Sequence, residues 1–214
     1  VKSFGGTILQ LPDDTSIAAN GLMNEGKIST QMGLPGKPVL AEELMLARDL
    51  KLARYADSKI HFTGISSPKS IGYIRRSKER GMQVTCSITP YQAFFCDEDL
   101  QGYDCNLKLN PPVRSREDML AIREALMSGT IDCIASHHLP QHQDTKDCEF
   151  EYAKPGMISL ETMFAVMNTI GLPVADFVLM QTKNARQIFN LPIPQIKEGH
   201  LATLTLFNAG TEYI

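Results

Sequence analysis

The segment Ile131-Asp132-Cys133-Ile134-Ala135-Ser136-His137-His138-Leu139-Pro140 decides the fold, because it is an apolar strand that ends abruptly in two histidines and a proline. Polar side chains at the end of a buried strand are typical of proteins built on parallel strands, where ligand and metal sites lie at the carboxyl ends of the strands. A metal or catalytic site at 136–142 is therefore the first hypothesis to test along the chain.

Strands alternate with helical segments through the rest of the sequence. We predict further strands at 7–11, 59–65 and 83–88 and helices at 41–55, 68–78 and 115–127. This alternation predicts βαβ units and a parallel sheet, and so the α/β class. Beyond the polar loop at 139–155, we predict helices at 160–169, 173–181 and 184–189 and a terminal strand at 200–207.

Local signals mark several helix starts and loops. Asp13 to Ser16 offer N-cap side chains for a short helix through Leu22, and we predict Glu117 as the capping-box partner of Ser115 or its neighbour. The run 33–38 contains too many glycines and prolines to be anything but a loop.

Composition excludes several classes of function. The chain has 214 residues, 43% of them hydrophobic, and a formal net charge of −3, so it lacks the basic stripe expected of a nucleic-acid-binding protein. No apolar run approaches the roughly 18 residues of a membrane span, and Val1 to Gly6 do not resemble a signal peptide. Five scattered cysteines without a CxxC pair predict reduced thiols. We therefore expect a soluble, cytoplasmic protein.

Several motifs together resemble one known family. They are Asp14-Thr15-Ser16-Ile17, Met23-Asn24-Glu25-Gly26, Gly33-Leu34-Pro35-Gly36, Ala41-Glu42-Glu43 with Ala47-Arg48-Asp49, the run 108–114 around Asn110-Pro111-Pro112, the run 129–135, and Glu149-Phe150 through Pro155-Gly156 to Leu160-Glu161-Thr162. Their order and spacing are similar to those of bacterial dihydroorotases of the long, allantoinase-like branch of the amidohydrolases.

The resemblance implies a metal-dependent (β/α)8 barrel that cyclises N-carbamoyl-aspartate to dihydroorotate in pyrimidine biosynthesis. It implies that this chain is the second half of such a barrel over 1–190, followed over 191–214 by the start of an accessory β-sandwich segment. The family's first half, with its His-x-His strand, has no counterpart before Val1. We therefore expect missing sequence or a partner chain, since half a barrel leaves two open sheet edges.

The family's metal ligands have been substituted at three positions. The fifth strand of the family ends in a ligand histidine that corresponds to Leu11, and the second histidine of the sixth strand corresponds to Gly64. The aspartate of the eighth strand, which binds metal and acts as general base, corresponds to His137. Zinc in this chemistry needs imidazole and carboxylate donors aimed at one point. The resemblance therefore implies a dismantled metal site.

Positions that match the family's substrate contacts are better preserved. Asn110 corresponds to an asparagine that contacts the substrate ring, and Pro155 and Gly156 to a loop whose backbone approaches it. A histidine contact has become Gln141. A vestigial ligand pocket is one interpretation of this pattern.

Alternative interpretations of these residues stay open. His61 on its strand suits a satisfied core histidine, and Asn110 before two prolines suits a turn residue. His137, His138 and His142 could bind a metal in a new arrangement, although adjacent strand residues point to opposite faces.

Three hypotheses of function follow from these observations. The first is a non-catalytic dihydroorotase homologue that serves as an assembly or scaffolding subunit, as a homo-oligomer or with aspartate transcarbamoylase. The second is an active dihydroorotase or related cyclic amidohydrolase with a rearranged zinc site. The third is a binding module that retains a small acidic ligand without turning it over. We favour the first, because three ligand positions have changed within well-matched surroundings.

Overall fold

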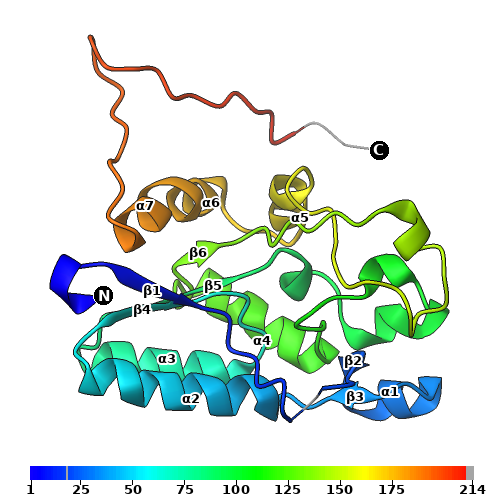
Figure 1. Cartoon of the computed structure of the whole chain (residues 1–214). Helices are drawn as coiled ribbons and strands as arrows, with labels where there is room; N and C mark the ends of the chain where they lie inside the picture. Colours follow the sequence, from blue (N-terminus) through cyan, green and yellow to red (C-terminus); the bar gives the residue numbers. More distant parts are fainter. Residues whose placement is uncertain (18, 211–214) are drawn as a thin grey trace.

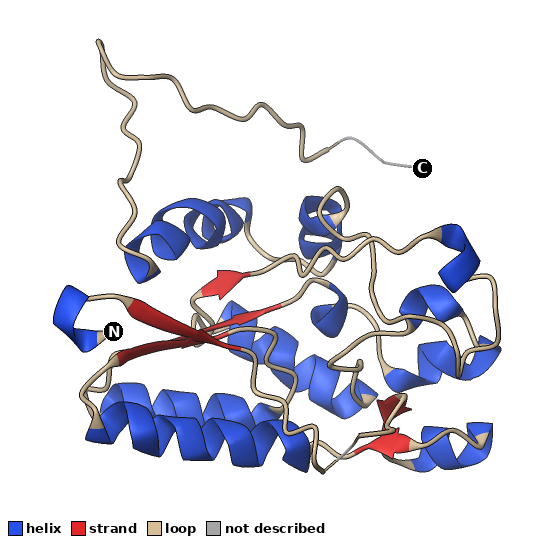
Figure 2. Ribbon diagram, in the orientation of Figure 1, coloured by secondary structure: helices blue, strands red, loops and turns tan. Residues whose placement is uncertain are grey.

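The computed structural model describes residues 1–17 and 19–210, and four parallel strands form its central sheet (Figures 1 and 2). The strands are β1 (Thr7–Gln10), β4 (Lys59–Phe62), β5 (Val84–Ile88) and β6 (Cys133–Ile134), in the order β1-β4-β5-β6. The register pairs Leu9 with His61, His61 with Thr85, and Ser87 with Cys133. The parallel sheet predicted from the alternation is confirmed, although each strand is shorter than its predicted range.

Three helices form the layer on one face of the sheet. They are α2 (Leu40–Tyr55), α3 (Pro68–Glu79) and α4 (Arg116–Met127), and α2 and α3 lie below the sheet in Figure 1. The core between these layers contains Leu46, Ile74 and Ile122 from the helices and Phe62 and Ile88 from the strands, all at most 1% exposed. Each such side chain contributes about 1.5–3 kcal/mol by its burial. All three helices agree with the predicted ranges to within two residues.

Serine side chains define where two of these helices begin. Ser67 accepts hydrogen bonds from the main-chain N–H groups of Lys69 and Ser70 at the start of α3. Ser115 accepts from the N–H of Asp118 and donates to its carboxylate at 2.8 Å. The capping partner is therefore Asp118, and the prediction of Glu117 was wrong by one residue, because the third position after the cap is 118.

A second helical layer covers the opposite face of the sheet (Figure 1). It consists of α5 (Met163–Thr169), α6 (Val174–Leu179), a π-helical turn η6 (Met180–Asn184) and α7 (Ala185–Ile188). The helices predicted at 173–181 and 184–189 are thus joined through the π turn. The side-chain amides of Gln181 and Asn184 donate to the carbonyls of Ile134 and Asp132, at 2.8 and 2.9 Å. These bonds attach the turn to the segment of β6.

Short elements build a smaller lobe beside the sheet. They are β2 (Met23–Asn24) paired with β3 (Gly36–Lys37), α1 (Lys27–Met32), and the 3-10 turns η2 (Tyr91–Ala93), η3 (Asp97–Gly102), η4 (Cys105–Leu107) and η5 (Gln143–Thr145), with a further turn η1 (Lys2–Phe4) near the start of the chain. The helix expected from Asp13 to Leu22 was wrong. The Asp14 carboxylate instead accepts from the N–H and hydroxyl of Ser16, which closes a turn.

The terminal strand expected at 200–207 was also wrong for the structure as described. Residues 191–210 have no strand, and Leu204 and Leu206 are 73% and 100% exposed. A strand requires a partner for its N–H and C=O groups, and none lies alongside this segment in the described chain (Figure 1). The accessory β segment over 191–214 stays a prediction, and residues 211–214 lie outside the described residues.

Both edges of the four-stranded sheet are open among the described residues. β1 pairs only with β4, and β6 only with β5, and Leu9 of β1 is 57% exposed. In a closed barrel each of these strands has a second neighbour. Among the described helices, none has the length and apolar character to cross a membrane.

Candidate active site at the carboxyl ends of the strands

Leu11, Gly64 and His137 meet at one point beyond the carboxyl ends of β1, β4 and β6. Gly64 has a φ of +70°, and a Cβ placed on it would lie 2.7 Å from Cε1 of His137 and 3.0 Å from Cδ1 of Leu11. Leu11 and Gly64 are 53 residues apart in the sequence, and Gly64 and His137 are 73 residues apart. The parallel sheet therefore brings together the three positions that the sequence predicted to be substituted metal ligands.

The His137 ring occupies the space that a side chain at position 64 would need. Its Nε2 lies 2.7 Å from Oγ1 of Thr63, and its backbone has a φ of 43°. Burial lowers the pKa of His137 from its usual value, so the ring is neutral at pH 7. A neutral imidazole held by a hydroxyl replaces the carboxylate expected at this position.

A chain of hydrogen bonds continues from His137 into the interior. Ser87 donates to Oγ1 of Thr63 at 3.0 Å and lies 3.1 Å from Nε2 of His61, whose Nδ1 lies 2.8 Å from Oγ1 of Thr85. Because Ser87 donates to Thr63, the Thr63 hydroxyl donates to His137, and His61 donates to Ser87. This chain of donors is consistent with two neutral rings.

His61 is held neutral by its surroundings. Burial lowers its pKa to about 4, and the Phe189 ring packs against it edge-on, with 5.6 Å between the ring centroids. His61 therefore fits the interpretation of a satisfied core histidine.

The residues of this half do not fit the metal that the resemblance implies. Leu11 and Gly64 carry no donor atom, and the Nε2 atom of His137 is engaged by Thr63. Over residues 1–17 and 19–210, no group of three or more His, Cys, Asp or Glu side chains is arranged to hold a metal ion. A zinc site needs several such donors at about 2.0–2.3 Å from one point.

The other two candidate histidines face different partners. Nδ1 of His138 accepts from the N–H groups of Ser159 and Leu160, at 3.2 Å each. His142 is exposed and lies 3.3 Å from the Asp144 carboxylate. The arrangement in which His137, His138 and His142 share one ion is therefore not formed.

Three of the predicted substrate-contact residues lie together. Nε2 of Gln141 donates to the carbonyl of Pro155 at 3.0 Å, and the N–H of Gly156 donates to the carbonyl of Lys108 at 2.9 Å. Gly156 has a φ of +144°, and a Cβ there would collide with the carbonyl of Leu139. This close approach requires glycine.

Asn110 lies on the adjoining loop and is held by a buried lysine. Nζ of Lys37 donates to Oδ1 of Asn110 and to Oδ2 of Asp13, both at 2.6 Å. The side chains of Lys37 and Asp13 are only 6% and 10% exposed, whereas Asn110 itself is exposed. Sequence reasoning missed Lys37, because it lies in a Gly- and Pro-rich run whose contacts come from distant segments.

A buried arginine ties the smaller lobe to the sheet. Nε of Arg114 donates to the Ser66 hydroxyl at 2.9 Å, and Nη1 donates to Oδ1 of Asn24 at 3.2 Å and to the carbonyl of Lys37 at 3.1 Å. Glu42 accepts from the N–H of Ser66. Neighbouring carboxylates such as Glu42 partly offset the burial that lowers the pKa of Arg114. This network fixes the loops behind the site.

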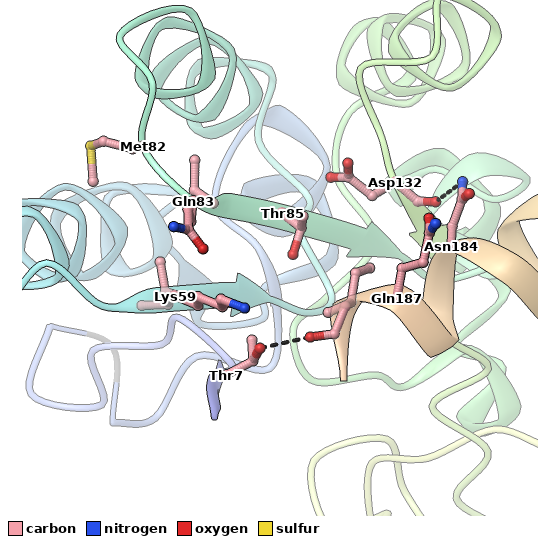
Figure 3. Close-up of a pocket in the computed structure, with 11 residues that line it drawn as sticks. Thr7, Lys59, Met82, Gln83, Thr85, Asp132, Asn184 and Gln187 are labelled. Carbon is pink, nitrogen blue, oxygen red and sulfur yellow. Dashed lines mark hydrogen bonds between the residues drawn. The ribbon is translucent and has the colours of Figure 1, made fainter. Parts of the chain in front are cut away.

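A pocket of about 380 Å³ opens at the other end of the strands (Figure 3). Its lining includes Thr7, Lys59, Thr85, Asp132 and Asn184. The Thr7 hydroxyl donates to the carbonyl of Ile188 at 2.6 Å. The amino ends of barrel strands serve stability more than chemistry, so this pocket is separate from the candidate site.

Comparison with solved structures identifies the class of fold. An L-hydantoinase from Arthrobacter aurescens superimposes with a TM-score of 0.76 at 23% identity, over 89% of this chain and 45% of that one. A dihydropyrimidinase from Brevibacillus agri gives 0.72 at 18% identity, over 87% and 44%. The fold is therefore the second half of an amidohydrolase-type (β/α)8 barrel.

Curated relatives identify the family. A dihydroorotase from Syntrophus aciditrophicus is 40% identical over all of this chain, and one from Geobacter metallireducens is 38% identical over 97% of it. The chain spans about half the length of these relatives, 51% and 50% respectively. No protein-family model matches the chain. The chain belongs to the dihydroorotase family.

Proposed function

We propose that this chain is part of a non-catalytic dihydroorotase-family protein of pyrimidine biosynthesis, with an assembly or scaffolding role. The observation that carries the proposal is the convergence of Leu11, Gly64 and His137, with the His137 ring beside the glycine. Two of these side chains cannot bind a metal, and the third is bonded to Thr63.

The chemistry of the family needs groups that Leu11, Gly64 and His137 do not supply. Hydrolysis or closure of a cyclic amide requires a polarised carbonyl and a general base that receives a proton. A carboxylate serves both as metal ligand and as base, but His137 has a lowered pKa and a neutral ring, and its Nε2 faces a hydroxyl. A weakened base next to two positions without a donor side chain supports retention of the fold for a purpose other than turnover.

The open strand edges bear on which partners we propose. β1 and β6 each have a single neighbour in the described chain, and unpaired edges favour pairing with another chain. The partners that we propose are the first half of the barrel, a second copy of the protein, and aspartate transcarbamoylase.

Retention of a small acidic ligand is a second candidate function. The observation that favours it is the grouping of Gln141, Pro155 and Gly156 beside the loop of Asn110. Substitution of Asn110 by alanine should reduce any rise in melting temperature that dihydroorotate causes, since a lost contact weakens binding and so the stabilisation. An unchanged rise would contradict this second candidate.

The test uses the full-length protein together with an active dihydroorotase measured in parallel. We expect substoichiometric zinc by elemental analysis and dihydroorotate hydrolysis at the level of a protein-free control. Size analysis of the same preparation should show association. Stoichiometric zinc with hydrolysis above background would establish instead the active enzyme with a rearranged site. A homogeneous monomer without association would remove the scaffolding role.

A further inference from the structure

Two cysteines are neighbours on the loops of the candidate site. Cys105 is five residues before Asn110, and Cys148 is seven residues before Pro155. The Cys105 thiol donates to the main-chain carbonyl of Cys148, with 3.2 Å between sulfur and oxygen. Both cysteines are partly exposed, whereas the remaining three, Cys86, Cys96 and Cys133, are buried.

Hydrogen bonds from two lysines hold the segments that carry these cysteines. Nζ of Lys146 donates to the carbonyls of Cys105 and Gly156, both at 2.8 Å. Nζ of Lys108 donates to the carbonyl of Phe150 at 2.6 Å. Lys108 also accepts, through its own carbonyl, the N–H of Gly156 at 2.9 Å. The two cysteines are therefore held as neighbours by bonds that do not involve their sulfur atoms.

The contact limits how far apart the two cysteines lie. Since the Cys105 sulfur touches the carbonyl oxygen of Cys148 itself, standard bond lengths limit the Cα–Cα distance to about 8 Å. Disulfides have Cα–Cα distances of about 4.4–6.8 Å. The Cys148 thiol donates to the carbonyl of Thr145, with 3.6 Å between sulfur and oxygen, so a disulfide requires both side chains to rotate and the Cα atoms to lie within this limit.

The local charges favour the reactive form of a thiol. The ammonium groups of Lys108 and Lys146 donate to main-chain carbonyls, and neither donates to a carboxylate in the described part of the chain. Nearby cations stabilise a thiolate, which is the nucleophile in thiol oxidation. Burial acts in the opposite sense and raises the pKa of Cys105, so oxidation should accelerate as the pH rises.

We propose that Cys105 and Cys148 form a reversible disulfide, an oxidation-sensitive link between the two loops of the candidate ligand site. Hydrogen peroxide is the oxidant. One thiolate attacks the O–O bond and yields a sulfenic acid and hydroxide, which takes up the proton that the thiol lost. The second thiol attacks the sulfenic sulfur, the S–S bond forms, the S–O bond breaks, and water leaves. Two thiols and one peroxide thus give one disulfide and two waters.

The test maps the cysteines of the full-length protein after peroxide treatment. Cleavage before aspartate releases residues 104–117 and 147–175, each with a single cysteine of this chain. Without reductant we expect these two peptides joined, with the loss of two hydrogens, and we expect dithiothreitol to separate them. Cys105→Ser and Cys148→Ser should each abolish the joined species, whereas the buried-cysteine variant Cys133→Ala should retain it.

A thermal readout checks the consequence for the loops. The link would close a loop of 44 residues, counted from 105 to 148 inclusive, and should raise the melting temperature by about 5 °C. The rise should be absent in Cys105→Ser. Free or irreversibly oxidised thiols at both positions, or linkage of either cysteine to another cysteine or another chain, would overturn the proposal. These outcomes do not depend on catalysis, so they are distinguishable from failure of the proposed function.

Discussion

Replacing Gly64 with alanine should destabilise the protein by about 3 kcal/mol. A φ of +70° costs an L-residue about 1–2 kcal/mol. The added Cβ would lie 2.7 Å from Cε1 of His137 and 3.0 Å from Cδ1 of Leu11, and overpacking of this kind costs about 1–3 kcal/mol. The ring cannot move away freely, because Thr63 holds its Nε2 at 2.7 Å.

A matched glycine separates the two contributions. Gly129 has a φ of +73° with no atom within 4 Å of its hypothetical Cβ, so Gly129→Ala should cost only the backbone contribution. Urea unfolding of the full-length protein followed by circular dichroism measures both variants. Adding His137→Ala should recover about 1–2 kcal/mol of the Gly64→Ala cost. The reasoning is refuted if Gly64→Ala costs no more than Gly129→Ala, or if His137→Ala leaves its cost unchanged.

Three further predictions concern groups around the site. Acidification from pH 6.5 to 4 should lower the free energy of unfolding by up to about 3 kcal/mol through His61. The reason is that the ring is protonated near its ordinary pKa of 6.5 in the unfolded chain but only near a pKa of about 4 in the folded protein. When the free energy of unfolding is measured against pH, His61→Gln should flatten this part of the curve. Lys37→Met should cost about 3 kcal/mol in chemical unfolding by leaving the Asp13 carboxylate buried without its partner, and adding Asp13→Asn should recover part of that loss. Ser115→Ala should lower stability by about 1 kcal/mol through its cap on α4, whereas Glu117→Ala should change the melting temperature little.

The main layers of the fold could be predicted because their signals are local. The helices α3 and α4 each show an apolar side, and the strands between the helices are short apolar runs. The helix α2 could be predicted from an unbroken run of good helix formers, although Leu44 and Leu52 are exposed and Glu42, Glu43 and Asp49 are buried. The smaller lobe was missed because its strands β2 and β3 have two residues each. Such strands form through long-range contacts such as the hydrogen bond from Arg114 to Asn24, and they show no periodicity.

The predicted site was correct in position but incomplete in content. Leu11, Gly64 and His137 could be singled out by resemblance to a family motif at each strand end, and the structure brings them together. Thr63 and Lys37 could not be found in this way. Their partners His137 and Asn110 are 74 and 73 residues away in sequence, and no local pattern encodes such pairs.

The sequence by itself determined the parallel α/β architecture, the family, and the loss of donor atoms at positions 11 and 64, because these follow from residue type and order. Only the tertiary structure decided what replaced the missing ligands at the candidate site. The neutral His137 ring fills the space beside Gly64 and begins a chain of hydrogen bonds that runs through Thr63 to His61. The physical reason is that burial and hydrogen-bond partners, which set the charge of an imidazole, come from strands far apart along the chain.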